Sequence, residues 1–175
     1  NAAAAYAAIQ VFKNNGLMVE DEAIARGFEN AKWFGRFEIL QQKPPVVIDS
    51  AHNRDSALKL RIALDDYFPG IPVILVFGAS EDKDIEGMLA ELMPRADYLI
   101  ATKSFHPRAI EAEKILEIAQ KYGLSDHIVP DVADAMHDAL LMSGGDKLVL
   151  ATGSIFIAAG GREAWYAQNS MVARA

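Results

Sequence analysis

The stretch Val46-Val47-Ile48-Asp49-Ser50-Ala51-His52-Asn53 decides the fold of this chain. Its apolar, strand-forming residues stop at Asp49, and small and polar residues form the turn that follows. A helical pattern of apolar residues begins near Asn53, which is a good N-cap residue. The pattern is typical of a buried parallel strand that leads into a helix. In open α/β sheets, the carboxyl end of such a strand carries ligand-binding groups.

The polar residues of this stretch have two interpretations. Asp49, Ser50, His52 and Asn53 lie together in one short loop, so they form a candidate ligand site. Alternatively, Asp49 and Asn53 only cap the turn and the helix, and His52 is an ordinary surface residue.

The rest of the chain alternates strands with helices. The pattern predicts strands at 37–40, 46–49, 73–78, 97–101, 126–130 and 147–151, and helices at 1–14, 20–30, 53–67, 84–92, 110–121 and 131–142, with a helical or mixed segment at the end. Such alternation indicates a mainly parallel sheet with helices on both faces. We therefore expect a doubly wound α/β domain of about six strands, preceded by two helices.

Composition narrows the class of protein. The chain has 175 residues, 51% of them hydrophobic, which is enough for one domain with a real core. Its formal net charge of -7 argues against a broad electrostatic contact with nucleic acid or an anionic membrane. The chain has no cysteine, which excludes disulfides and thiolate metal sites, and no apolar stretch reaches the roughly 20 residues that cross a bilayer. These features are compatible with the cytoplasm, where we expect the protein.

Four polar loops follow predicted strands, at residues 49–53, 78–84, 102–108 and 152–154. Because such loops converge at one edge of a parallel sheet, they offer a set of groups suited to an anionic ligand. The chain has no G-x-x-x-x-G-K-[ST] phosphate loop, no G-x-G-x-x-G after its first strand, no metal-ligand spacing of histidines and no G-x-S-x-G. We therefore expect it to complete a site rather than to contain a whole one.

Arg36 follows Gly35 in a connector and also has two interpretations. It is either a solvated arginine or a guanidinium on a mobile linker that reaches a phosphate. The first residue is Asn rather than Met, and the chain begins directly in helix-forming residues, so we expect it to be a piece of a longer protein.

Six motifs in order resemble those of the folylpolyglutamate/dihydrofolate synthases of the Mur ligase superfamily. They are Asn1-Ala2-Ala3-Ala4-Ala5, Trp33-Phe34-Gly35-Arg36-Phe37-Glu38, Asp49-Ser50-Ala51-His52-Asn53, Phe77-Gly78-Ala79 with Asp82-Lys83-Asp84, Pro107-Arg108-Ala109, and Thr152-Gly153-Ser154. The chain departs from the family at Phe34, where Pro is usual, at Ser50, where Gly is usual, and at Ile155-Phe156 in place of Leu-Tyr. No departure removes a charged group.

The resemblance implies an ATP-dependent ligase that adds L-glutamate to a folate through an acyl phosphate. It implies that residues 1–36 are the helical tail of the central ATPase domain plus the interdomain linker, and that residues 37–175 are the Rossmann-like C-terminal domain. The phosphate loop and most Mg²⁺ ligands would lie in the central domain, outside this chain. We therefore expect no metal ligand here, no activity from the chain alone, and the central domain as its partner.

The resemblance also implies roles for single residues. Asn1, Arg36, Asp49 and His52 would bind ATP, with Arg36 and His52 as the catalytic pair. Candidates for the incoming glutamate or the domain interface are Ser80, Lys83, Arg108 and Ser154. Lys83 lies between two acidic residues and is equally consistent with a salt bridge at the start of a helix.

Two other functions remain open from the sequence. One is another Mur-type amide ligase, acting on peptidoglycan precursors. The other, from a different class, is a free-standing α/β binding module with a pocket of its own.

Overall fold

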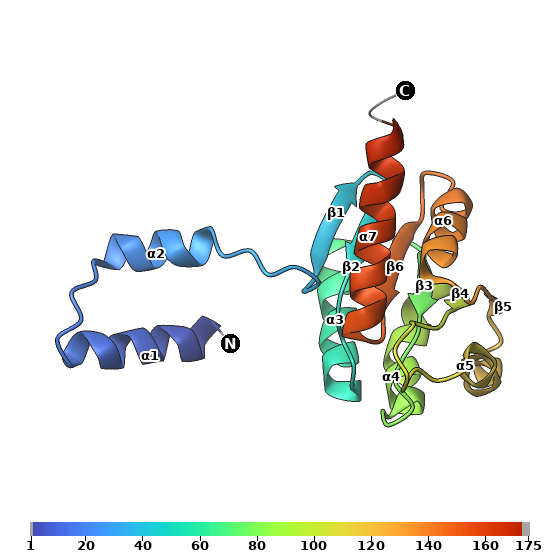
Figure 1. The fold of residues 1–175 in the computed structure, drawn as a ribbon, viewed down its shortest axis with the longest axis horizontal. Coiled ribbons are helices and arrows are strands. Elements are labelled where there is room, and N and C mark those ends of the chain that lie inside the picture. Colours follow the sequence, from blue (N-terminus) through green and yellow to red (C-terminus); the bar gives the residue numbers. More distant parts are fainter. Residues whose placement is uncertain (1, 173–175) are drawn as a thin grey trace. The chain divides into compact units, whose positions relative to one another are not determined.

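The computed structural model describes residues 2–172, and the chain divides into two compact units between Phe34 and Gly35 (Figure 1). The first unit contains α1 (Ala2–Asn14) and α2 (Asp21–Glu29), close to the predicted helices. Helix α1 buries none of its residues, and α2 buries only Ile24. No helix in the part of the chain that the structure describes is long and apolar enough to span a bilayer.

The second unit, residues 35–175, is built on one sheet and is called the α/β unit below. Its strands are β1 (Glu38–Gln42), β2 (Pro45–Ile48), β3 (Val73–Phe77), β4 (Ala96–Ala101), β5 (Ser125–Ile128) and β6 (Leu148–Thr152). They lie in the order β1-β2-β6-β3-β4-β5, and only the edge strand β1 runs antiparallel to its neighbour. The prediction of a mainly parallel six-stranded sheet is confirmed.

Helices cover both faces of this sheet (Figure 1). They are α3 (Arg54–Tyr67), α4 (Ile85–Leu92), α5 (Ala112–Ala119), α6 (Val132–Met142) and α7 (Ile155–Val172), with short 3₁₀ turns at Met93–Arg95 and Gln120–Tyr122. Successive side chains of a strand point to opposite faces, so Leu75 packs with α3, α4 and α5 while Val76 packs with α6 and α7. Helices α3, α4 and α5 connect β2, β3, β4 and β5 in turn and lie on one face of the sheet. Helix α6 then leads from the edge strand β5 back to β6, between β2 and β3, on the other face, as right-handed crossover connections require.

One predicted helix, 110–121, is shorter in the structure. It begins at Ala112, because the Ile110 amide donates to the Ala79 carbonyl (3.0 Å) and is therefore part of a loop–loop contact. It ends at Ala119, where the backbone tightens into the 3₁₀ turn.

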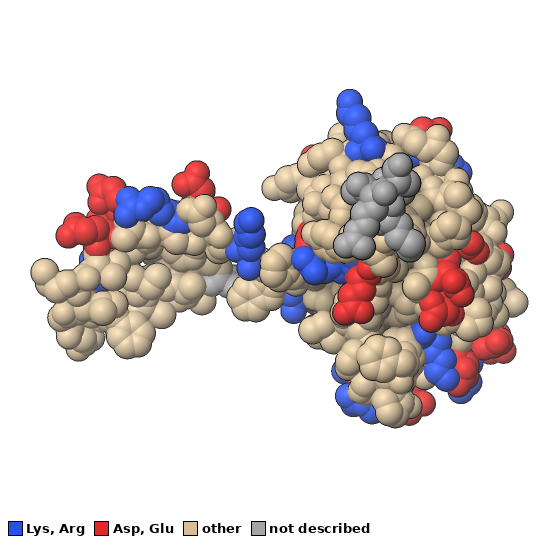
Figure 2. Space-filling view, turned by 45° about the horizontal axis from the view of Figure 1, so that its top comes forward, with Lys and Arg blue, Asp and Glu red and all other residues tan. Residues whose placement is uncertain are grey.

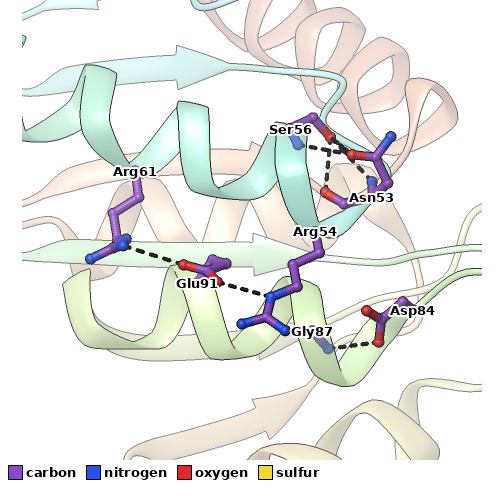
Figure 3. Close-up of polar contacts among 7 residues, drawn as sticks. All are labelled: Asn53, Arg54, Ser56, Arg61, Asp84, Gly87 and Glu91. Atoms are coloured by element: carbon purple, nitrogen blue, oxygen red, sulfur yellow. Dashed lines mark hydrogen bonds and ion pairs between the residues drawn. The ribbon is translucent and has the colours of Figure 1, made fainter.

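Side-chain caps fix the starts of the helices that follow β2 and β3 (Figure 3). The Asn53 side chain accepts from the Ser56 amide (2.8 Å), and the Ser56 hydroxyl accepts from the Asn53 amide (3.1 Å), which is a capping box. Asp84 accepts from the Gly87 amide (2.9 Å) at the start of α4. Asn53 thus has the capping role that the sequence left open.

Two ion pairs to one carboxylate join α3 to α4 (Figure 3). Glu91 in α4 accepts from Arg54 (3.0 Å) and from Arg61 (3.2 Å), both in α3. The two helices that carry the loops after β2 and β3 are therefore held against each other.

Two glycines allow the loops after β3, β4 and β6 to approach one another. A Cβ on Gly78 would lie 2.6 Å from the Thr102 carbonyl oxygen. Gly153 has φ +107°, and its Cβ would lie 2.4 Å from the Gly78 carbonyl oxygen. Side chains at either position would push apart the loops that the sequence predicts to form a site.

We predict that Gly153→Ala destabilises the chain far more than Gly70→Ala. Both positions have positive φ, but a Cβ on Gly70 would meet nothing within 4 Å. Left-handed backbone alone costs about 1–2 kcal/mol at a non-glycine residue, and overlap with the Gly78 backbone should raise the loss at Gly153 to about 3–4 kcal/mol. Urea denaturation of the 175-residue chain measures both losses; equal losses would contradict this role of Gly153.

Candidate functional site

A hollow of about 240 Å³ lies at the carboxyl ends of β2, β3 and β6. Its lining is Arg36, Ser50, His52, Ser80, Lys83, Arg108, Ser154, Ile155 and Phe156. We call it the cationic hollow. It brings together every residue predicted to bind ATP or glutamate except Asn1, which lies outside the described residues, and Asp49.

Asp49 lies beside the cationic hollow and joins two backbone segments. One carboxylate oxygen accepts from the Phe37 amide and the other from the Ala51 amide, both at 2.7 Å. Burial raises the pKa of this carboxyl above its ordinary value, although the two amides and the Arg36 charge act in the opposite direction. Asp49 lines a separate hollow, of about 240 Å³, that it shares with Arg36 and α3.

Arg36 lies between two anchored peptide groups. The Gly35 carbonyl accepts from the Ser50 amide (2.8 Å), and Phe37 donates to Asp49 as described above. The Phe37 ring packs against Tyr67, with centroids 5.2 Å apart. The backbone at Arg36 is thus fixed to the α/β unit, which corrects the picture of a guanidinium on a mobile linker.

The Arg36 side chain is exposed and lines both hollows. Among the described residues, no hydrogen bond or ion pair holds its guanidinium. An exposed guanidinium on a fixed backbone can form bidentate hydrogen bonds to a phosphate or a carboxylate.

His52 has an oriented ring. Its Nδ1 lies 3.0 Å from the Ser50 carbonyl oxygen, which can only accept, so Nδ1 carries the proton. In the neutral ring Nε2 is then an acceptor, and in the charged ring it is a second donor. The His52 amide donates to the Ser56 hydroxyl (3.1 Å), which ties the residue to the start of α3.

Lys83 and Arg108 gather around one carboxylate, Asp82. The Lys83 ammonium lies 2.8 Å and the Arg108 guanidinium 3.8 Å from the same Asp82 oxygen. The hydrogen bond from Lys83 holds the pKa of Asp82 below its ordinary value. The Glu81 amide donates to the Arg108 carbonyl (2.9 Å), so the two loops form one platform. The salt bridge proposed for Lys83 therefore exists, at the rim of the cationic hollow.

The start of helix α7 forms one wall of the cationic hollow. The buried Ser154 hydroxyl accepts from the Ile157 amide (3.2 Å) and caps the helix, and Ile155 and Phe156 line the hollow. The helix therefore directs the positive end of its macrodipole toward the cationic residues.

Sequence reasoning missed an aromatic stack at this wall. His106 lies on Phe156 with centroids 4.2 Å apart and a 22° tilt, and its Nδ1 accepts from the Arg108 amide (3.2 Å). The stack connects the loop that carries Arg108 to the first turn of α7. Its only signal in the sequence was the position of His106 in one of the four polar loops.

The arrangement suits anions bound through their oxygens. The cationic hollow combines two guanidinium groups, one ammonium, an imidazole and three serines. On the face of the α/β unit visible in Figure 2, acidic side chains lie among the basic ones. In the part of the chain that the structure describes, no group of three or more His, Asp or Glu side chains could hold a metal ion. The residues of the hollow thus fit phosphate or carboxylate groups.

The profile of a protein family described as Mur ligase, glutamate ligase domain, matches residues 35–155. The chain belongs to this family. The matched range begins at the first residue of the α/β unit and, with the exception of Phe156, includes the whole lining of the cationic hollow. The cationic hollow is therefore part of the Mur ligase domain.

Relatives of this Mur ligase domain carry consistent names. The "Probable bifunctional folylpolyglutamate synthase/dihydropteroate synthase" of Halobacterium salinarum is 36% identical over 150 residues, covering 84% of this chain and 18% of the relative. The structure of Escherichia coli FolC in complex with DHPP and ADP is similar with TM-score 0.83 and 30% identity, covering 93% of this chain and 38% of that one.

A third relative is the bifunctional folylpolyglutamate synthase/dihydrofolate synthase of Yersinia pestis, complexed with AMPPNP and Mn ion. It has TM-score 0.79 and 30% identity, and the match covers 91% of this chain and 38% of that one. The chain thus spans well under half the length of each of these three relatives.

We predict that the pKa of Asp49 lies above that of an ordinary aspartate and that the pKa of Asp82 lies below it. Asp49 has a raised pKa in the folded chain, so its contribution to stability is present at low pH and is lost as pH rises through that pKa. Asp82 has a lowered pKa, so its contribution is present at neutral pH and is lost on acidification. Carboxyl NMR titration of the 175-residue chain measures both midpoints, and the reverse order would contradict the assigned environments.

Proposed function

We propose that this chain is the C-terminal domain of an ATP-dependent ligase that adds L-glutamate to a folate. The observation that carries the proposal is the cationic hollow, in which Arg36, His52, Lys83 and Arg108 come from four separate segments. The family is described as a glutamate ligase domain, the names of the relatives include folylpolyglutamate synthase, and the similar structure of Escherichia coli FolC is a complex with DHPP and ADP. ATP and glutamate both present the anionic oxygens that this set of residues favours.

The proposed reaction has two steps. The folate carboxylate attacks the γ-phosphorus of ATP, which forms an acyl phosphate and releases ADP. The amine of glutamate then attacks the acyl carbon, and the tetrahedral intermediate expels inorganic phosphate and leaves an amide. Phosphoryl transfer depends mainly on positioning and on neutralisation of charge, and these are what a domain without a phosphate loop can supply.

Arg36 and His52 act on the nucleotide side in this proposal. The Arg36 guanidinium is exposed and its backbone is fixed. It is therefore available to neutralise charge on the transferred phosphoryl group. His52 adds a hydrogen bond from Nε2 when its ring is protonated. Asp49 orients this pair through the Phe37 and Ala51 amides and lies against α3, where it remains a candidate for a direct contact with the nucleotide.

Lys83 and Arg108 act on the amino-acid side. Glutamate has two carboxylates. Lys83 and Arg108, which lie near the same Asp82 oxygen, can each exchange this contact for one with a carboxylate of the substrate. Ser80 and Ser154 line the same hollow and offer hydroxyl groups there. The central ATPase domain, to which the residues before Gly35 would contribute a helical tail and linker, supplies the phosphate loop and the Mg²⁺ ligands.

The acceptor distinguishes this proposal from ligation of a peptidoglycan precursor. The names of the relatives favour folate. Assay of the complete protein with ATP, L-glutamate and each acceptor decides between them: phosphate release should depend on the folate, and release that depended only on a peptidoglycan precursor would overturn the choice.

We predict that Arg36→Ala lowers kcat of the complete enzyme about a thousandfold, the usual scale for an arginine that stabilises phosphoryl transfer. The free energy of unfolding should change by less than about 0.5 kcal/mol, because the guanidinium is exposed. Lys147→Ala is the matched control, since Lys147 pairs with Asp97 (2.6 Å) before β6, at the other end of the strands. Steady-state kinetics with unchanged turnover in Arg36→Ala would remove Arg36 from the mechanism.

A further inference from the structure

Glu38, the first residue of β1, makes contacts that the predicted site does not use. One of its oxygens accepts from the Gly35 amide at 2.7 Å. Both oxygens accept from Nε of Arg162 in α7, at 2.9 and 3.1 Å. The pair is mostly shielded, with side-chain exposures of 15% for Glu38 and 28% for Arg162. A single carboxylate therefore ties the chain before β1 to the last helix.

These contacts complete a frame around Arg36. The peptide group before Arg36 is held through the Gly35 carbonyl by Ser50, and the peptide group after it is held through the Phe37 amide by Asp49. Glu38 adds the Gly35 amide to the frame. Phe37 has φ 43°, a conformation that an L-residue adopts only where the surroundings hold it.

The other end of the ion pair belongs to the helix that lines the cationic hollow. Arg162 lies about two helical turns beyond Ile155, and its guanidinium lies over the Tyr166 ring, 4.8 Å from the centroid. Glu38 and Arg162 thus link the backbone that presents Arg36 to the helix that presents Ser154 and Phe156.

We propose that Glu38 and Arg162 are positioning residues for Arg36, and that they make Arg36 move with the α/β unit rather than with the preceding helices. Any reorientation of the α/β unit relative to the preceding helices then occurs N-terminal to Gly35. This inference rests on the proposed role of Arg36 in phosphoryl transfer. It assigns to Glu38 and Arg162 no contact with either substrate.

A positioning role and a structural role predict different kinetics. Removing one partner of a mostly shielded ion pair can destabilise the fold whether or not Arg36 is present. A shift of about 1 Å in a catalytic group can cost about a hundredfold in rate, and this loss of turnover should occur only while Arg36 is present.

The test uses the complete enzyme with Glu38→Gln, Arg162→Gln and Arg162→Lys. We expect the first two to lower kcat about tenfold to a hundredfold with little change in KM for folate, and Arg162→Lys to recover much of the loss. Asp97→Asn is the matched control, because it breaks the ion pair with Lys147 (2.6 Å) far from Arg36 in the fold and should leave kcat unchanged.

The decisive measurement repeats Glu38→Gln and Arg162→Gln in the Arg36→Ala background. If the pair acts through Arg36, neither second substitution lowers kcat further. If each lowers kcat by the same factor in both backgrounds, the positioning role is overturned, and either variant alone suffices if the other fails to fold. A wild-type enzyme without glutamate-dependent activity would instead overturn the proposed function, so the two failures are distinguishable.

Hydrogen exchange of the 175-residue chain gives a readout that does not depend on activity. Glu38→Gln should speed exchange of the Gly35 and Phe37 amides, while Asp97→Asn should not. Equal protection of these amides in both variants would show that Glu38 does not hold the frame, and would overturn the inference.

Discussion

The two hydrogen bonds that the Asp49 carboxylate accepts, from the amides of Phe37 and Ala51, are the constraint on which the site depends. They join the segment before β1 to the loop after β2, and therefore fix Arg36 on one side and the turn that carries His52 on the other. The carboxylate can do this because it stands at the end of a buried strand, where the turn leaves backbone amides without ladder partners. Burial raises its pKa, and the two amides counter that cost.

The loops after β3, β4 and β6 can approach one another because two of their residues are glycines. Gly78 and Gly153 let the backbones after β3, β4 and β6 approach within distances that a Cβ would forbid. Lys83, Arg108 and the start of α7 are thereby presented to the same space as Arg36. The result is a set of cations and hydroxyls that suits the charge-neutralising part of the proposed ligase site. The proposal assigns the phosphate loop to another domain.

Much of this could be predicted from local pattern. The apolar run before Asp49, the cap at Asn53 and the four polar loops were enough to place the sheet and most of the hollow, because each signal lies within a few neighbouring residues. Contacts between distant segments gave no such signal. Glu38 and Arg162 lie 124 positions apart in the chain, and the stack of His106 on Phe156 also joins separate loops. The same limit explains why the helix predicted from 110 begins only at Ala112, since a bond to Ala79 decides it.

The central claim is that this domain supplies one side of a nucleotide site that another domain completes. Calorimetric titration of Mg²⁺–ATP into the complete protein and into the 175-residue chain tests it most directly. The account predicts saturable binding to the complete protein and no measurable heat of binding to the chain alone at millimolar nucleotide. Tight binding by the chain alone that survived substitution of Arg36, Asp49 and His52 would contradict it.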